Sequence, residues 1–172
     1  SQDEWSIALR YANEFNGVRV AAGAGYHEDG PIEGWGASAA MQHTASGIFV
    51  AVSYTDIEDT SITTAGYRDT AESWSVIGGM ARKFSPLGKT TFWVRYAEYE
   101  GRTGQSAVAG YLTSHADLDV LSLGINQKID AAAREIYASY YNVSSDATVS
   151  TTGARTDFDD FDAVILGARI FF

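Results

Sequence analysis

The sequence contains no cysteine, which excludes disulfide bonds and thiolate metal sites. Basic side chains are scarce, with 12 Lys and Arg against 22 Asp and Glu, and proline is nearly absent. The net charge of −10 argues against binding nucleic acid through a general positive field. No run approaches the roughly 18 to 20 apolar residues of a membrane-spanning helix. Strands that cross a membrane escape this criterion, because only every second residue in them is apolar.

The start of the chain has neither the basic residues nor the apolar segment of a secretory signal. We therefore expect a mature form or a fragment. At 172 residues, we expect one domain, residues 1–172.

Apolar and polar residues alternate along most of the chain. Residues 5–15 have a period of two, which predicts a β-strand. Asn16-Gly17 follows, a strong hairpin signal, because a type I′ turn needs positive φ at both positions. In the return strand, residues 18–26, the apolar residues fall on the same face as those of residues 5–15. The two strands can therefore pair with their apolar residues on one side of the hairpin.

The same alternation predicts about nine strands in all and no helix. The connections are expected to alternate strictly between short turns and long loops, which is typical of an all-β, antiparallel up-and-down meander. The further strands are expected at residues 35–43, 48–55, 74–84, 90–99, 117–129, 134–143 and 162–172, and long loops at 28–34, 56–71 and 101–116.

Aromatic residues gather at the strand ends. Trp5 with Phe15, and Trp74 with Phe84, bracket about ten residues, which is the length of a tilted strand that crosses a bilayer. Tryptophans lie at the long-loop ends and phenylalanines at the short-turn ends, and two such belts are typical of an outer-membrane barrel. We therefore favour a transmembrane β-barrel over a soluble lipocalin-like barrel or sandwich. The expected interface aromatics are Trp5, Phe15, Trp35, Trp74 and Phe84.

Several cations occupy the phase opposite to the apolar face. In a membrane barrel this phase faces a water-filled lumen, where charge sets the selectivity between anions and cations. In a soluble barrel it would face solvent, so this pattern alone fits both. The predicted pore-lining residues are Arg10, Arg19, Arg95, Lys128 and Arg169.

Several segments resemble Gram-negative general porins of the proteobacterial type, in the C-terminal half of the barrel. They are residues 10–15 (RYANEF), 18–23 (VRVAAG), 84–91 (FSPLGKTT), 130–133 (DAAA) and 158–172 (FDDFDAVILGARIFF). The chain end is also similar to the assembly signal of that family, at Gly167, Ile170 and Phe172, although Ile165 stands where a polar residue is usual.

The resemblance implies a homotrimer in the lipid of the bacterial outer membrane, with long loops extracellular and short turns and the C-terminus periplasmic. It also implies that the barrel-assembly machinery recognises the C-terminal strand. Bacterial barrels have even strand numbers and periplasmic ends, so nine strands beginning on the extracellular side predict part of a larger, 16-stranded barrel. The alternative is a complete eight-stranded barrel, which requires one predicted strand to be false.

The expected function is passive diffusion of small hydrophilic solutes and ions, without enzymatic chemistry. In the porins that the chain resembles, a basic wall faces an acidic loop folded into the lumen, and that loop belongs to the earlier half. One alternative is a structural or adhesive barrel that conducts nothing. Another is a barrel-embedded hydrolase, because catalytic triads assemble in space rather than in sequence.

No cofactor is expected. His27, His43 and His115 are too scattered for a metal site. The acidic segments 56–59 and 157–160 have the oxygen ligands of a divalent-cation site, but solvated loop charge is the preferred interpretation. Residues 23–25 (Gly-Ala-Gly) lie inside a strand and open no helix, so they are not a dinucleotide-binding motif.

Overall fold

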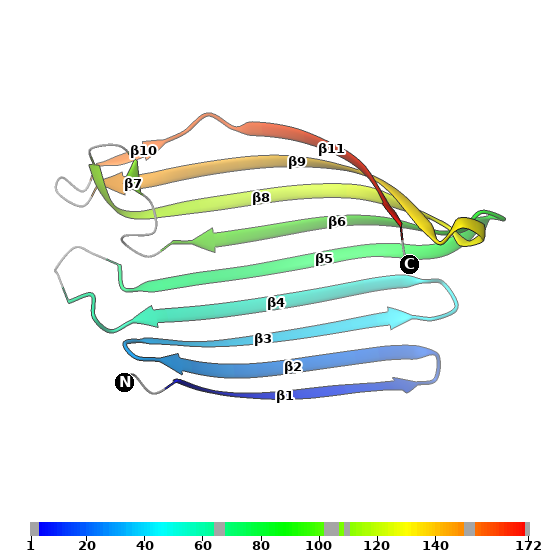
Figure 1. Ribbon diagram of the computed structural model, residues 1–172, viewed down its shortest axis with the longest axis horizontal. Helices are drawn as coiled ribbons and strands as arrows, with labels where there is room; N and C mark the ends of the chain where they lie inside the picture. Colours follow the sequence, from blue (N-terminus) through cyan, green and yellow to red (C-terminus); the bar gives the residue numbers. More distant parts are fainter. Residues whose placement is uncertain (1–3, 64–67, 102–106, 109–110, 150–153, 171–172) are drawn as a thin grey trace.

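The computed structural model is a single layer of antiparallel β-sheet (Figure 1). It describes residues 4–63, 68–101, 107–108, 111–149 and 154–170. Residues 107–108, 111–115 and 149 are described by their backbone alone. Within these ranges there is no α-helix, and a single turn of 3-10 helix, η1 (Asp130–Ala132), lies between two strands.

Nine strands of ten or more residues follow one another in the described chain, as the alternating pattern predicts. They are β1 (Glu4–Phe15), β2 (Val18–Asp29), β3 (Ile32–His43), β4 (Ile48–Asp59), β5 (Thr70–Ser85), β6 (Gly88–Glu100), β8 (Tyr111–Ile129), β9 (Arg134–Val149) and β11 (Phe161–Ile170). Two short strands, β7 (Ala107–Val108) and β10 (Arg155–Asp157), lie beside β8 and β9.

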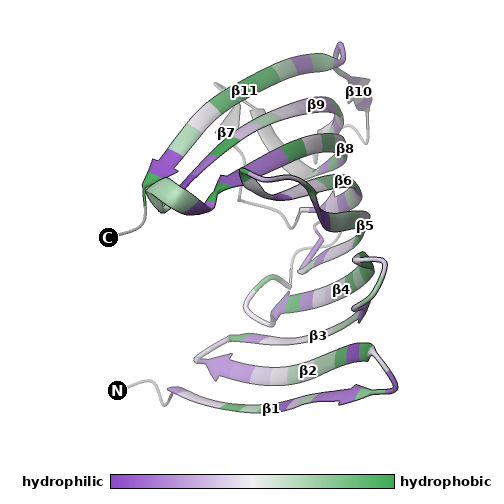
Figure 2. Ribbon diagram, turned by 90° about the vertical axis from the view of Figure 1, so that its right-hand side faces the viewer, coloured by the Kyte–Doolittle hydropathy of each residue, from purple (hydrophilic) through white to green (hydrophobic). Residues whose placement is uncertain are grey.

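The long strands pair antiparallel in chain order, which confirms an all-β, up-and-down sheet. All nine predicted strands are present, whereas the eight-stranded alternative required one to be false. The sheet is not closed, since β1 and β11 are its two edges. Figure 2 shows that the sheet is bent into an open arch, with β1 and β11 at its two ends.

The two ends of the strands form two rims. At the turn rim, tight turns join β1 to β2, β3 to β4, β5 to β6 and β8 to β9; at the loop rim, the remaining connections join the strands. The first turn has the positive φ values that the hairpin signal predicts, 48° at Asn16 and 79° at Gly17.

The prediction of strictly alternating short and long connections is wrong at one place. Residues 28–34 are not a loop, because β2 and β3 continue pairing until only Gly30 and Pro31 join them. Gly30 has a φ of 59°, which permits this tight turn. Glu28 and Glu33 pair directly across the ladder, so these polar residues extend the strands beyond the apolar stretch.

Other strands also exceed their predicted limits for the same reason. Residues 56–59 belong to β4, β8 begins at Tyr111, and β9 continues to Val149. The expected loops at 56–71 and 101–116 are therefore shorter than predicted. Hydrophobic alternation does not detect the end of a strand when the residues there are polar.

The arch has an apolar convex face and a polar concave face. A hollow lined by Phe49 of β4, Trp93 of β6 and Arg169 of β11 lies on one side of the sheet. In a flat sheet with the usual strand spacing, β4 and β11 would lie about 24 Å apart. Their side chains can therefore line one hollow only on the inner side of a curved sheet. The residues in phase with them form the concave face.

Burial follows the same division. In the described chain the buried hydrophobic side chains are Ala97 and Ala147, both in the concave phase. Nearly all of the exposed large hydrophobic side chains are in the convex phase, with Leu9 77% and Leu166 74% exposed. The apolar face therefore does not form a core within this sheet.

Candidate functional site: the concave wall

The concave face differs between the two halves of the arch. Over β1 to β4 it carries mainly Ala, Gly and Ser, and two hollows there have Arg10 and many small residues in their lining. Over β5 to β11 it carries bulky aromatic and charged side chains, which line the hollow that reaches from β4 to β11. The first half of the wall is therefore smooth and the second half is crowded with polar groups.

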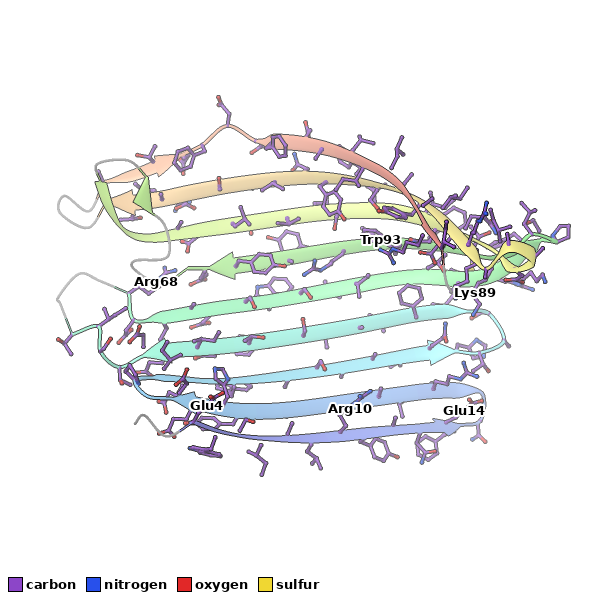
Figure 3. All side chains as sticks on the ribbon, viewed as in Figure 1. Glu4, Arg10, Glu14, Arg68, Lys89 and Trp93 are labelled. Atoms are coloured by element: carbon purple, nitrogen blue, oxygen red, sulfur yellow. The ribbon has the colours of Figure 1, made fainter. Side chains whose placement is uncertain are left out.

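Arg10 lies near the middle of β1, between Glu4 and Glu14, which lie toward opposite ends of the strand (Figure 3). Its register partner is Gly23, and a Cβ on Gly23 would lie 3.6 Å from the Arg10 Cγ. That distance is ordinary van der Waals contact, so the arginine stem packs beside Gly23 without requiring a glycine there. Arg10 is exposed, and it has no ion pair within the residues that the structure describes.

Arg19 is already paired. Its Nε donates to the Glu14 carboxylate at 2.9 Å across the β1–β2 hairpin, and both side chains are about half exposed or more. Such a pair in solvent contributes little to stability, about 0–1 kcal/mol. It neutralises the charge of Arg19 at the turn rim.

Arg95 lies on β6 in the crowded half of the wall. Its Nη2 donates a hydrogen bond of 2.7 Å to the Tyr99 hydroxyl, a neutral acceptor. On β8, the register partner of Arg95 is Ser122, which is 1% exposed. Arg95 lies beside this small buried residue and forms no ion pair within the described part of the chain.

A chain of polar contacts connects β6, β8, β9 and β11 beside Arg95. Trp93 Nε1 donates to Asn126 Oδ1 at 3.0 Å, and Asn126 Nδ2 donates to Glu135 Oε1 at 3.0 Å. Arg169 Nη1 lies 3.6 Å from the same Glu135 oxygen. The Arg169 guanidinium also lies over the Tyr137 ring, 5.1 Å from its centroid.

Lys128 and Arg169 flank the same carboxylate from two strands. Both are register partners of Glu135, Lys128 on β8 and Arg169 on β11, but the ion pair is with Arg169. The Lys128 residue is exposed at the turn rim. The five predicted basic residues thus lie in the concave phase, and the structure brings only Arg95 and Arg169 together around one hollow.

The aromatic residues predicted to lie at membrane interfaces form two belts on the convex face. At the loop rim, Trp5 packs on Tyr26, Trp35 on Tyr54 and Trp74 on Tyr96, with ring centroids 5.0 to 5.3 Å apart. At the turn rim, Phe15 ends the first hairpin strand, and Phe84 packs edge-on against Phe92 at 5.9 Å.

Carboxylates on the neighbouring strands accept hydrogen bonds from the tryptophans of the loop-rim belt. Trp5 Nε1 donates to Glu28 at 3.0 Å, and Trp74 Nε1 donates to Glu98 at 2.9 Å. The same rim is cross-linked by Arg68, which contacts carboxylates of β6 and β8. The Tyr26 and Tyr54 hydroxyls donate to Glu33 and Glu72, which lie nearer the rim, so these polar atoms point toward the rim and the ring bodies remain on the apolar face.

Part of the predicted assembly signal lies in β11. Gly167 faces the Tyr137 ring so closely that a Cβ would collide with it. Ile170 ends β11 and is 54% exposed. Phe172 lies outside the described residues.

The structure also locates the groups considered for metal binding. Within the described ranges, no group of three or more His, Asp or Glu residues could hold a metal ion. Residues 56–59 lie on a strand, so Asp56 and Asp59 fall on opposite faces and cannot converge. His43 is hydrogen-bonded to Ser46 at 2.8 Å, His27 lies on β2, and the His115 side chain is not described.

The polar chain through Trp93, Asn126, Glu135 and Tyr137 was not predicted from the sequence. These residues share the concave phase with Arg95 and Arg169, which is the signal that identifies their face. Their contact depends on the cross-strand register of β6, β8, β9 and β11. That register follows from the intervening turns, which a period-two pattern does not fix.

Comparison with protein-family models, curated proteins and solved structures finds no match for this chain. In the described residues no helix is long and apolar enough to cross a membrane.

Proposed function

We propose that this chain forms part of the wall of a bacterial outer-membrane diffusion channel of the general-porin type. The convex face would contact lipid, and the concave face would line a water-filled lumen through which small hydrophilic solutes pass passively. The observation that carries the proposal is the direction of the curvature. The sheet bends toward its polar face, whereas a soluble barrel bends toward its apolar face to make a core.

The aromatic belts support the same arrangement. Tyr and Trp rings at a membrane surface keep the ring body in the apolar layer and direct the N–H or O–H group toward water. Tyr26 and Tyr54 are arranged in this way, with their hydroxyls donating to Glu33 and Glu72, which lie nearer the loop rim than the rings. Between the belts, the convex positions are apolar, for example Val52 and Val94, which are 49% and 50% exposed.

The proposal includes an orientation and further strands. The longer connections lie at the loop rim, so we place that rim outside the cell and the turn rim in the periplasm. Strands β1 and β11 both run from the loop rim to the turn rim, so they cannot pair antiparallel with each other. A closed lumen would therefore need an odd number of additional strands between them.

The test is conductance of the full-length protein in a planar lipid bilayer. We expect discrete, reproducible current steps at both polarities. If folded protein inserts into the bilayer and carries no current, the channel is ruled out and a structural or adhesive barrel becomes the better account. Hydrolysis of ester substrates by the folded protein, abolished by a single serine substitution, would instead favour the embedded hydrolase.

A further inference from the structure

We propose that the concave wall binds small organic carboxylates in the hollow around Arg95 and that the lumen accordingly favours anions. This proposal rests on the proposed channel function, since it names the class of solute for that same wall. The hollow has a volume of about 410 Å³ and extends from β4 to β11. Such a volume is in the range of sites that hold small molecules.

The charge of the hollow is positive. Three charged side chains line it, namely Arg95, Glu135 and Arg169. Glu135 is compensated, because Arg169 and Asn126 both contact its Oε1 atom, and its side chain is only 10% exposed. The charge of Arg95 is left without a partner carboxylate among the described residues, since its hydrogen bond goes to the neutral Tyr99 hydroxyl.

Arg95 has the donor geometry for a carboxylate. A guanidinium carries five N–H donors in a planar fork that matches the two oxygens of a carboxylate. The bond to Tyr99 uses Nη2, which leaves donors on the remaining nitrogen atoms. The buried Ser122 on the strand beside Arg95 is small and so does not fill the hollow.

The other walls suit an organic body rather than a bare inorganic ion. Phe49, Ile77, Trp93 and Tyr141 line the same hollow and offer apolar and aromatic surface. A planar unsaturated or aromatic carboxylate could contact these rings while its oxygens meet Arg95. Benzoate is the simplest probe with both properties.

The distribution of charge over the wall supports an anion preference. The chain carries a net charge of −10, yet in the described middle of the concave face the two charges without an ion-pair partner are the cations Arg10 and Arg95. The concave carboxylates of the first hairpin lie at the rims, with Glu4 and Asp29 at the loop rim and Glu14, which pairs with Arg19, at the turn rim. A positive wall raises the local concentration of anions in the lumen.

The test combines ion selectivity with benzoate binding on the full-length protein. The reversal potential in a KCl gradient should show chloride preferred over potassium, and benzoate should block the current. Arg95→Gln should weaken benzoate block by about tenfold or more, because a charge-assisted bond is lost. The matched control is Arg82→Gln, which removes an exposed arginine in the convex phase of β5.

A second measurement separates the two proposals. Benzoate binding is followed on detergent-solubilised protein by tryptophan fluorescence, with Trp93→Phe to assign the signal. Protein that binds benzoate through Arg95 and never conducts would overturn the channel and retain the site. A conducting channel that prefers potassium, or whose benzoate affinity is unchanged in Arg95→Gln, would overturn the anion site.

Discussion

Replacement of Val52 by arginine tests which face of the wall contacts lipid. Val52 lies in the apolar stretch of β4 between Ile48 and Tyr54, and it is 49% exposed in the isolated sheet. An arginine facing lipid near the middle of the bilayer destabilises a barrel by about 2–4 kcal/mol. This corresponds to a folding equilibrium that is about 30- to 800-fold less favourable.

The matched control is Ala51→Arg at the adjacent position. Ala51 is on the concave face, where it lines the hollow around Arg10, so an arginine there can remain in water. We expect a cost below about 1 kcal/mol, as for an ordinary solvent-facing substitution. The assay is urea unfolding of the full-length protein in phosphatidylcholine vesicles, with free energies extrapolated linearly to zero urea. If Ala51→Arg costs as much as Val52→Arg, or more, the assignment of the two faces is refuted.

Three further substitutions test the turns, the belt and the polar chain. Gly47→Ala should destabilise the fold by about 1–2 kcal/mol in the same unfolding assay. Gly47 has a φ of 75°, and an added Cβ would collide with the backbone of β5. An unchanged free energy of unfolding would contradict this turn geometry. Trp74→Phe removes the hydrogen bond to Glu98 but retains a ring, so a loss of about 0.5–1.5 kcal/mol is expected by urea titration, and a larger loss would show that the contact does more than anchor the rim. Glu135→Gln frees the charge of Arg169, so the reversal potential should move further toward that of chloride; a shift toward potassium would contradict the charge assignment.

Period-two alternation and turn chemistry predict most of the fold. The position of the first turn is predicted correctly from Asn16-Gly17, because a type I′ turn depends only on the backbone angles of its two central residues. The β2–β3 connection is predicted wrongly, because Glu28, Asp29 and Glu33 are polar residues that still pair as strand. Alternation detects where a strand is apolar, whereas backbone pairing continues wherever the neighbouring strand continues.

The candidate site is predicted only in part. The phase of Arg95 and Arg169 follows from their sequence positions, so their face is predictable. Their grouping with Glu135 depends on the register of strands separated by turns and loops, which is a property of the whole sheet. The curvature is likewise seen only in the assembled sheet, where side chains of β4 and β11 line one hollow.

The most direct test of the central claim is a labelling scan along β4 in lipid vesicles. These 172 residues contain no cysteine, so a single cysteine introduced at residue 50, 51, 52 or 53 is the one nitroxide-labelling site within them. The account predicts that labels at residues 50 and 52 collide mainly with oxygen dissolved in lipid, and that labels at residues 51 and 53 collide mainly with a water-soluble nickel complex. Reversed phases, or equal accessibility at all four positions, would contradict a wall with lipid on its convex face and water on its concave face.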